Sequence, residues 1–201
     1  MQLQKGEFVA VMGSSGCGKS TLLKLLMGLY APDGGSIWVQ EKDPAGSRRL
    51  GMEDSGLFAY VPQGNQLMSG TIRQILAFDD PEKMKQEQQL WNALKIACAD
   101  RFVSQLPLGL DAPLGEHGSG LSEGQIQRLA LARAVFSRRP VLLLDEATSS
   151  LDEETERNLL DNLRTMTDRT VLLVTHRPRA CGICDRVVRL EPGPDHSSGG
   201  V

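Results

Sequence analysis

The sequence predicts a single α/β domain in which a parallel-sheet core is interrupted by a mostly helical insertion. A short apolar run, Phe8–Met12, feeds a glycine-rich loop that opens a helix, as expected of a buried strand. Two further apolar runs, residues 141–144 and 171–174, are continuous, which is typical of parallel strands covered on both faces. The stretch between about residues 71 and 139 has helical character instead.

Length and composition limit the classes of protein. With 201 residues, 40% of them hydrophobic and 23% charged, the chain suits one soluble domain with a core. The net charge of -3 argues against nucleic acid as the main partner, because a basic patch is expected there. No apolar run reaches the ~18–20 residues of a membrane span, and no signal peptide opens the chain. We therefore expect any membrane link to go through a separate segment or partner.

The elements before residue 70 are read from apolar periodicity and turn residues. A helix is predicted over residues 20–29, with one leucine face made of Leu22, Leu25, Leu26 and Leu29. A turn at 32–35 leads to a strand at 36–39, and the polar stretch 41–56 predicts an exposed loop. Residues 58–61 form another predicted strand, which Pro62 ends.

The later elements follow the same logic. A helix is predicted to start at Pro81 and to bury a face made of Leu90, Leu94, Ala97 and Cys98. A crossover helix between the two apolar strands is marked by Leu159, Leu160, Leu163 and Met166. Residues 187–190 predict a last strand, and the tail 191–201 is predicted to be loose. The core spans about 1–70 and 140–190 and the helical insertion about 71–139, and we count them as one domain, 1–201.

The motif Gly13-x4-Gly18-Lys19-Ser20 lies between a predicted strand and a predicted helix, which is the context of a phosphate-binding P-loop. Glycines let backbone N–H groups approach phosphates, and the helix N-terminus adds a positive dipole. We expect Lys19 to neutralise the β- and γ-phosphates and the Ser20 hydroxyl to coordinate Mg²⁺. A glycine-rich turn with a chance lysine is the alternative, which the flanking elements disfavour.

Asp145 and Glu146 end an apolar strand, so they should face the ligand crevice of an open α/β sheet. We expect Asp145 to hold Mg²⁺ through water and Glu146 to orient or deprotonate the attacking water. Gln63 also follows a strand and could sense Mg²⁺ or that water, although a surface glutamine is the usual default. His176 follows the strand 171–175, where a structural histidine is common and a γ-phosphate contact is the functional alternative.

Ser122 and Gln125 have the spacing of a capping box, in which the serine caps a helix and the glutamine answers it. Read alone, this pattern is a helix cap. Cys181 and Cys184 form a Cys-x-x-Cys pair near His176. A zinc site needs four ligands and the sequence offers no second pair, so we expect reduced thiols.

Taken in order, these motifs resemble the ATP-binding cassette of the ABC family over nearly the whole chain, from Gly6 to Leu190. Walker A corresponds to 13–21, the Q-loop to 60–63, the signature to 121–125, Walker B to 141–146, the D-loop to 149–152 and the switch histidine to His176. The resemblance implies a P-loop NTPase with a RecA-like core and a helical signature subdomain. It implies ATP and Mg²⁺ as ligands and hydrolysis with Glu146, His176, Gln63 and Lys19 as catalytic residues. The implied nucleotide-binding residues are Gly13, Ser14, Ser15, Gly16, Cys17, Gly18, Lys19, Ser20, Thr21, Ser122, Gly124 and Gln125, and the implied metal residues are Ser20, Gln63 and Asp145.

Two segments resemble the exporter branch of that family, namely residues 67–73 and the Gly115-Glu116 loop before the signature, which exporters place against the membrane domain. Three features of the chain depart from the pattern of that family. The family usually has glycine where this chain has Glu123. This chain starts too late to include the family's adenine-stacking aromatic, and the usual final helices after Leu190 are missing. The resemblance therefore suggests a trimmed cassette of a longer exporter.

The partners that the resemblance implies are a transmembrane domain, in the same longer chain or a separate subunit, and a second nucleotide-binding domain in a homo- or heterodimer. The dimer would place Ser122 against a phosphate bound on the opposite subunit, at the cytoplasmic face of the membrane. Two alternatives stay open: a soluble cassette ATPase, as in DNA repair or translation, and a non-catalytic regulatory cassette. The interval between the P-loop and the signature holds no heptad run, which argues against the repair class. Glu146 and His176 argue against the regulatory class. A P-loop kinase or GTPase would not need the signature.

Overall fold

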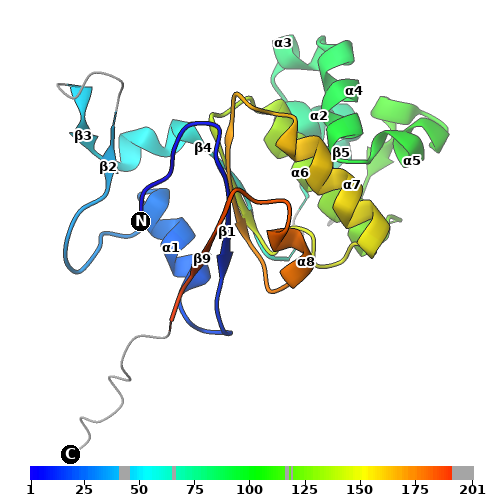
Figure 1. Cartoon of the computed structure of the whole chain (residues 1–201). Helices are drawn as coiled ribbons and strands as arrows, with labels where there is room; N and C mark the ends of the chain where they lie inside the picture. Colours follow the sequence, from blue (N-terminus) through cyan, green and yellow to red (C-terminus); the bar gives the residue numbers. More distant parts are fainter. Residues whose placement is uncertain (41–45, 65–66, 116–117, 119, 192–201) are drawn as a thin grey trace, which may run out of the picture.

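The centre of the molecule is a parallel sheet of five strands in the order β4-β7-β8-β1-β9 (Figure 1). The computed structural model describes residues 1–40, 46–64, 67–115, 118 and 120–191. The strands are β1 (Phe8–Met12), β4 (Phe58–Val61), β7 (Val141–Asp145), β8 (Thr170–Val174) and β9 (Arg186–Arg189). All four pairings are parallel, which confirms the predicted α/β class.

The strand register brings the predicted site residues to one edge of the sheet. Val61 lies opposite Leu144, and Asp145 lies opposite Val174, which pairs in turn with Val11. Because the strands are parallel, their carboxyl ends coincide at this edge. The loops that follow β1, β4, β7 and β8 therefore leave the sheet side by side, and these loops carry the P-loop, Gln63, Glu146 and His176.

Helices cover both faces of the sheet, so the central strands are apolar on both sides. One face packs against α1 (Lys19–Leu26), whose Leu23 is fully buried with Val9, Val11 and Leu172. The other face packs against α6 (Glu123–Phe136) and α7 (Glu153–Arg164) (Figure 1). The predicted leucine face of the first helix was wrong in part, because Leu23 makes its buried centre and Leu29 is exposed.

The helical region contains shorter elements than the sequence predicted. Its helices are α2 (Ile72–Ala77), α3 (Pro81–Met84), α4 (Glu87–Ile96) and α5 (Asp100–Gln105), and they gather at one end of the molecule (Figure 1). The helix predicted from Pro81 is two helices, because α3 ends before Lys85 and α4 starts at Glu87. The predicted apolar face of α4 is buried at Leu90 and Leu94. An antiparallel pair, β5 (Gly70–Thr71) with β6 (Pro113–Leu114), and a 3-10 turn, η3 (Gly109–Asp111), flank this region.

The stretch predicted as an exposed loop, 41–56, is partly structured. Residues 41–45 lie outside the described residues. Beyond them β3 (Arg48–Arg49) pairs with β2 (Trp38–Val39), and a 3-10 helix, η2 (Met52–Leu57), leads into β4. An ion pair between Arg48 and the buried Asp54 ties this hairpin to η2, which explains the order in a polar stretch.

Near the C-terminus, α8 (Pro178–Cys181) precedes β9, which starts one residue before the predicted strand. Met166 lies beyond the end of α7. The predicted loose tail falls almost wholly outside the described residues, which end at Glu191. None of the described helices is long and apolar enough to span a membrane.

Candidate functional site

The P-loop joins β1 to α1, and its lysine is folded back onto it. Lys19 Nζ donates to the carbonyl oxygens of Gly13, at 2.9 Å, and Ser14, at 2.7 Å, and lies 3.9 Å from Cys17 Sγ. The lysine is buried, and no carboxylate pairs with its ammonium among the described residues. A buried cation without an anionic partner is costly unless an anion joins it. Its surroundings therefore fit a phosphate.

Gly18 is the N-cap residue of α1, and its backbone lies in the left-handed region with φ of 95°. Gly16 has φ of 80°, and a Cβ built on either glycine would meet nothing within 4 Å. Other residues are strained at such angles, so the loop needs glycine for its backbone turn. The space beside both positions is open, as a cradle for phosphate requires.

Glu146 is the centre of a cluster drawn from three strand ends. Its Oε2 accepts a hydrogen bond of 2.8 Å from Gln63 Nε2, and its Oε1 lies 3.6 Å from Nδ1 of His176. The Glu146 side chain is 19% exposed and His176 is 62% exposed, so the cluster opens to solvent on the histidine side. Glu146 has φ of 49°, which is unusual for a residue other than glycine and typical of functional positions.

Asp145 has a partner that the sequence analysis did not identify. Tyr60 Oη on β4 donates a hydrogen bond of 3.1 Å to Asp145 Oδ2 on the neighbouring strand. Asp145 is 2% exposed. Burial, with the nearby Asp145 charge, raises the pKa of Tyr60 to about 12. The hydroxyl thus stays protonated at neutral pH and can donate. The strand register revealed this pair, and no local sequence pattern signals it.

The capping box at the start of α6 is confirmed. Ser122 Oγ accepts from the Gln125 backbone N–H at 3.2 Å, and Gln125 Oε1 accepts from the Ser122 N–H at 2.8 Å. Gly124 passes close to the loop after β7, because a Cβ there would lie 3.1 Å from the Ser150 oxygen. Within the described ranges, no hydrogen bond links Ser122, Gly124 or Gln125 to residues 13–21 of the same chain.

Gln127 is a second residue that sequence reasoning missed. It is 1% exposed on α6, where its Oε1 accepts from Ser150 Oγ at 2.6 Å and from Ser150 N at 3.2 Å. Its Nε2 donates to the Glu146 carbonyl at 3.3 Å. Gln127 therefore connects the capped helix to the backbone that carries Glu146. A polar residue two positions after a signature glutamine is the only sequence signal.

The donor set suits Mg²⁺ better than a transition metal. Among the residues that the structure describes, no group of three or more His, Cys, Asp or Glu side chains could hold a metal ion. Mg²⁺ keeps waters and substrate oxygens and needs only one or two protein oxygens. Asp145 and Ser20 offer such oxygens near the strand ends. Cys181 and Cys184 are free thiols, and burial raises the pKa of Cys184 to about 12, so this group stays protonated at neutral pH.

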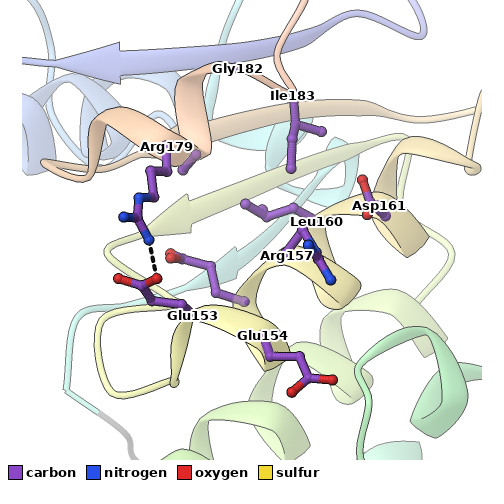
Figure 2. Close-up of a pocket in the computed structure, with 10 residues that line it drawn as sticks. Glu153, Glu154, Arg157, Leu160, Asp161, Arg179, Gly182 and Ile183 are labelled. Carbon is purple, nitrogen blue, oxygen red and sulfur yellow. Dashed lines mark hydrogen bonds and ion pairs between the residues drawn. The ribbon is translucent and has the colours of Figure 1, made fainter.

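Two cavities of the molecule show whether size identifies the site. One, of about 430 Å³, lies between the P-loop and His176 and is lined in part by Gly13, Ser14 and Arg189. A larger one, of about 640 Å³, lies between α7 and α8 (Figure 2). None of the predicted site residues lines the larger cavity, so size alone does not identify the site. Glu116, from the loop expected to face a membrane domain, lies outside the described residues.

Comparison with known proteins gives consistent matches. A family model described as "ABC transporter" matches residues 1–149. The leukotoxin translocation ATP-binding proteins LktB of Mannheimia glucosida and of Mannheimia haemolytica are 37% identical over 200 residues. Each match covers 96% of this chain and 27% of the relative. A solved bacterial Atm1-family ABC exporter with ATP bound superposes with a TM-score of 0.82 at 30% identity, over 96% of this chain and 33% of that chain.

Proposed function

The chain belongs to the ABC transporter family, and we propose that it binds and hydrolyses ATP to drive export by a longer protein or complex. The observation that carries this proposal is the meeting of Gln63, Glu146 and His176 at the sheet edge that also holds the P-loop. The chain spans 27% of the length of the curated relatives, which are named for translocation, and this supports a working unit larger than the chain.

Nucleotide binding is assigned to the P-loop. Its backbone, residues 13–18, and the hydroxyls of Ser20 and Thr21 would surround the phosphates, and Lys19 would exchange its loop carbonyl contacts for phosphate oxygens. Ser20, Asp145 and Gln63 would hold Mg²⁺. The ion would neutralise charge on the phosphate oxygens during transfer. Tyr60 would keep the Asp145 carboxylate in one orientation toward that ion.

Hydrolysis is assigned to Glu146, which would accept a proton from the attacking water. Gln63 occupies one carboxylate oxygen and His176 lies beside the other, so both would set the orientation of Glu146 before water arrives. The exposed His176 could also turn toward the γ-phosphate. This arrangement favours a catalytic cassette over a regulatory one, because a purely regulatory domain needs no aligned base.

The second half of each site would come from another cassette. The start of α6 offers a capped helix N-terminus at Ser122, Gly124 and Gln125, with Ser122 exposed, which is a favourable position for a phosphate. Within the described residues it makes no hydrogen bond to the P-loop of its own chain. A dimer in which each α6 start faces the partner's bound nucleotide would use both the helix start and the P-loop of each chain. The partner could be a second copy or a related chain.

The membrane domain would dock beside Phe78. This aromatic follows α2, is 56% exposed and lies with its ring 5.1 Å from the Arg133 guanidinium. It borders a cavity of about 320 Å³ between β4 and α6. An exposed aromatic beside a groove is typical of an interface. Such docking would hold the chain at the cytoplasmic face of the membrane.

Mixing variants tests the composite site. Lys19→Ala and Ser122→Arg should each abolish turnover alone, because each homodimer lacks one half of both sites. An equimolar mixture should regain activity, because the mixed dimer holds one intact site. Lys19→Ala mixed with Glu146→Gln is the matched control and should stay inactive, since both residues belong to the same half. A mixture of Lys19→Ala and Ser122→Arg without activity would contradict a homodimeric composite site.

A further inference from the structure

Arg177 follows His176 directly and binds the loop after β7. Its Nη2 donates to the Ser149 carbonyl at 2.6 Å, and its Nη1 donates to the Leu151 carbonyl at 3.1 Å. The same Nη1 lies 2.9 Å from Glu156 Oε2 on α7. One planar guanidinium thus joins two carbonyls of a single loop to a carboxylate, a geometry that lysine cannot reproduce.

Glu156 on α7 makes a second contact with the same loop. It is 6% exposed, and its second oxygen, Oε1, accepts a hydrogen bond of 2.6 Å from Thr148 Oγ1. The ion pair is partly buried, since the Arg177 side chain is 28% exposed, and it is a weak source of stability because desolvation offsets the attraction. It does specify geometry, since loss of Arg177 would leave the buried Glu156 carboxylate without its cation. The pair therefore fixes the position of the loop more than it stabilises the fold.

The loop held in this way is continuous with Glu146. The Ser149 N–H donates to the Glu146 carbonyl at 3.0 Å, and Gln127 on α6 contacts the same carbonyl and Ser150. Glu146 itself has the strained φ of 49°. Such a conformation persists only where its surroundings over-determine it. Segment 146–151 is held between Gln127 on α6 and Arg177 after β8.

We propose that Arg177 is a positioning residue that, with Glu156, holds segment 146–151 and so keeps Glu146 in its catalytic orientation next to His176. This inference rests on the proposed function in assigning Glu146 as the base. The contacts of Arg177 are with the carbonyls of Ser149 and Leu151 and with the Glu156 carboxylate. Loss of Arg177 should slow the hydrolytic step while leaving nucleotide binding nearly unchanged, because the P-loop makes none of these contacts.

Arg179 provides a matched control two residues further along the chain. Figure 2 shows its side chain reaching from α8 to Glu153 on α7, across the large cavity. Both members of this pair are exposed, at 77% and 76%, and within the described residues Arg179 contacts no part of segment 146–151. Arg179→Met removes the same charge and the same side-chain length as Arg177→Met, without touching the loop.

Hydrogen exchange of the whole chain without nucleotide tests whether Arg177 and Glu156 hold segment 146–151. In Arg177→Met, the amides of Ser149 and Leu151, which donate to Glu146 and Thr148, should exchange at least about tenfold faster. Arg179→Met should match the wild type. Arg177→Lys keeps a cation beside Glu156 but loses the guanidinium that donates to both loop carbonyls. It should therefore fold and show an amide exchange rate between those of the wild type and Arg177→Met. Equal exchange in Arg177→Lys, Arg179→Met and wild type would overturn the proposal.

Turnover and binding then test the consequence. At saturating Mg-ATP, turnover should fall roughly ten- to hundredfold in Arg177→Met, as expected for a misplaced base, while the Kd for ATP stays within about twofold. Arg179→Met should keep wild-type turnover. A wild type that does not hydrolyse ATP would count against the proposed function. An active wild type with equal turnover in Arg177→Met and Arg179→Met would overturn the role of Arg177 alone.

Discussion

The side-chain amide of Gln63 donates a hydrogen bond to the carboxylate of Glu146, with 2.8 Å between Nε2 and Oε2. The two residues are 83 positions apart in sequence and meet because β4 and β7 are parallel neighbours. With His176 beside the other oxygen, both oxygens of Glu146 face named side chains. The proposed base is therefore oriented by the fold itself, and its neighbours are direct targets for mutation.

Lys19→Ala should weaken ATP binding. The lysine supplies a buried cation at the P-loop, and a charge-assisted hydrogen bond contributes about 1.5–3 kcal/mol. The Kd for ATP should rise roughly ten- to hundredfold, which nucleotide titration measures. Lys24→Ala is the control, because Lys24 lies on the same helix but stacks on the Tyr30 ring at 5.7 Å. Unchanged affinity in Lys19→Ala would remove the P-loop assignment.

Tyr60→Phe should raise the Mg²⁺ concentration that half-maximal ATP binding requires. The change removes one hydroxyl and leaves Asp145 without the donor that orients it, at a cost of about 1–3 kcal/mol. Nucleotide binding titrated with Mg²⁺ measures the effect, which should be several-fold. Tyr30→Phe is the control, because Tyr30 is exposed and these are the only two tyrosines of the chain. Equal Mg²⁺ requirements in the two variants would contradict the role of Tyr60.

The same tyrosine predicts a pH dependence at the alkaline end. The folded-state pKa of Tyr60 is raised to about 12, above the unfolded value of about 10. Its contribution to stability is therefore fully present below pH ~10 and is lost as the pH rises through ~12. Tyrosinate absorbance should show a raised titration in the folded wild type. It should vanish in Tyr60→Phe, and its persistence there would contradict the assignment to Tyr60.

Glu123→Gly should change ATP-driven dimerisation and turnover by less than about tenfold in the protein with its membrane domain. Glu123 is exposed in the first turn of α6, where a carboxylate stabilises the helix by ~0.3–1 kcal/mol. Pointed at a phosphate from ~8 Å it would cost ~2 kcal/mol, and in solvent screening removes most of that. Glu123→Gln separates charge from backbone flexibility. A gain of a hundredfold would show a degenerate signature and favour a heterodimer with one impaired site.

The sequence predicted the central strands well because they are buried on both faces and so read as continuous apolar runs, as at 141–144. The capping box at Ser122 was predictable for a different reason, because its two residues are three positions apart and interact locally. Leu23 was missed because the crowded leucines of α1 allow more than one helical face.

Contacts between strands and around the largely buried helix α6 were beyond local patterns. Tyr60 meets Asp145 only through the register of two strands far apart in sequence. Gln127 sits on a helix whose buried residues follow one another from Leu129 to Ala132, so no polar face reveals its burial. The division of the domain at about residues 71 and 139, and the roles of the site residues, stay predictions.

The most direct test of the central claim is ATP binding and hydrolysis measured on the same sample of Glu146→Gln. Binding should be retained, since the P-loop is untouched, while hydrolysis should fall at least ~10²-fold, the usual contribution of a positioned general base. Size-exclusion chromatography with Mg-ATP should then show a trapped dimer. Glu154→Gln, an exposed glutamate on α7, should behave as the wild type. Hydrolysis by Glu146→Gln at the wild-type rate would contradict the account.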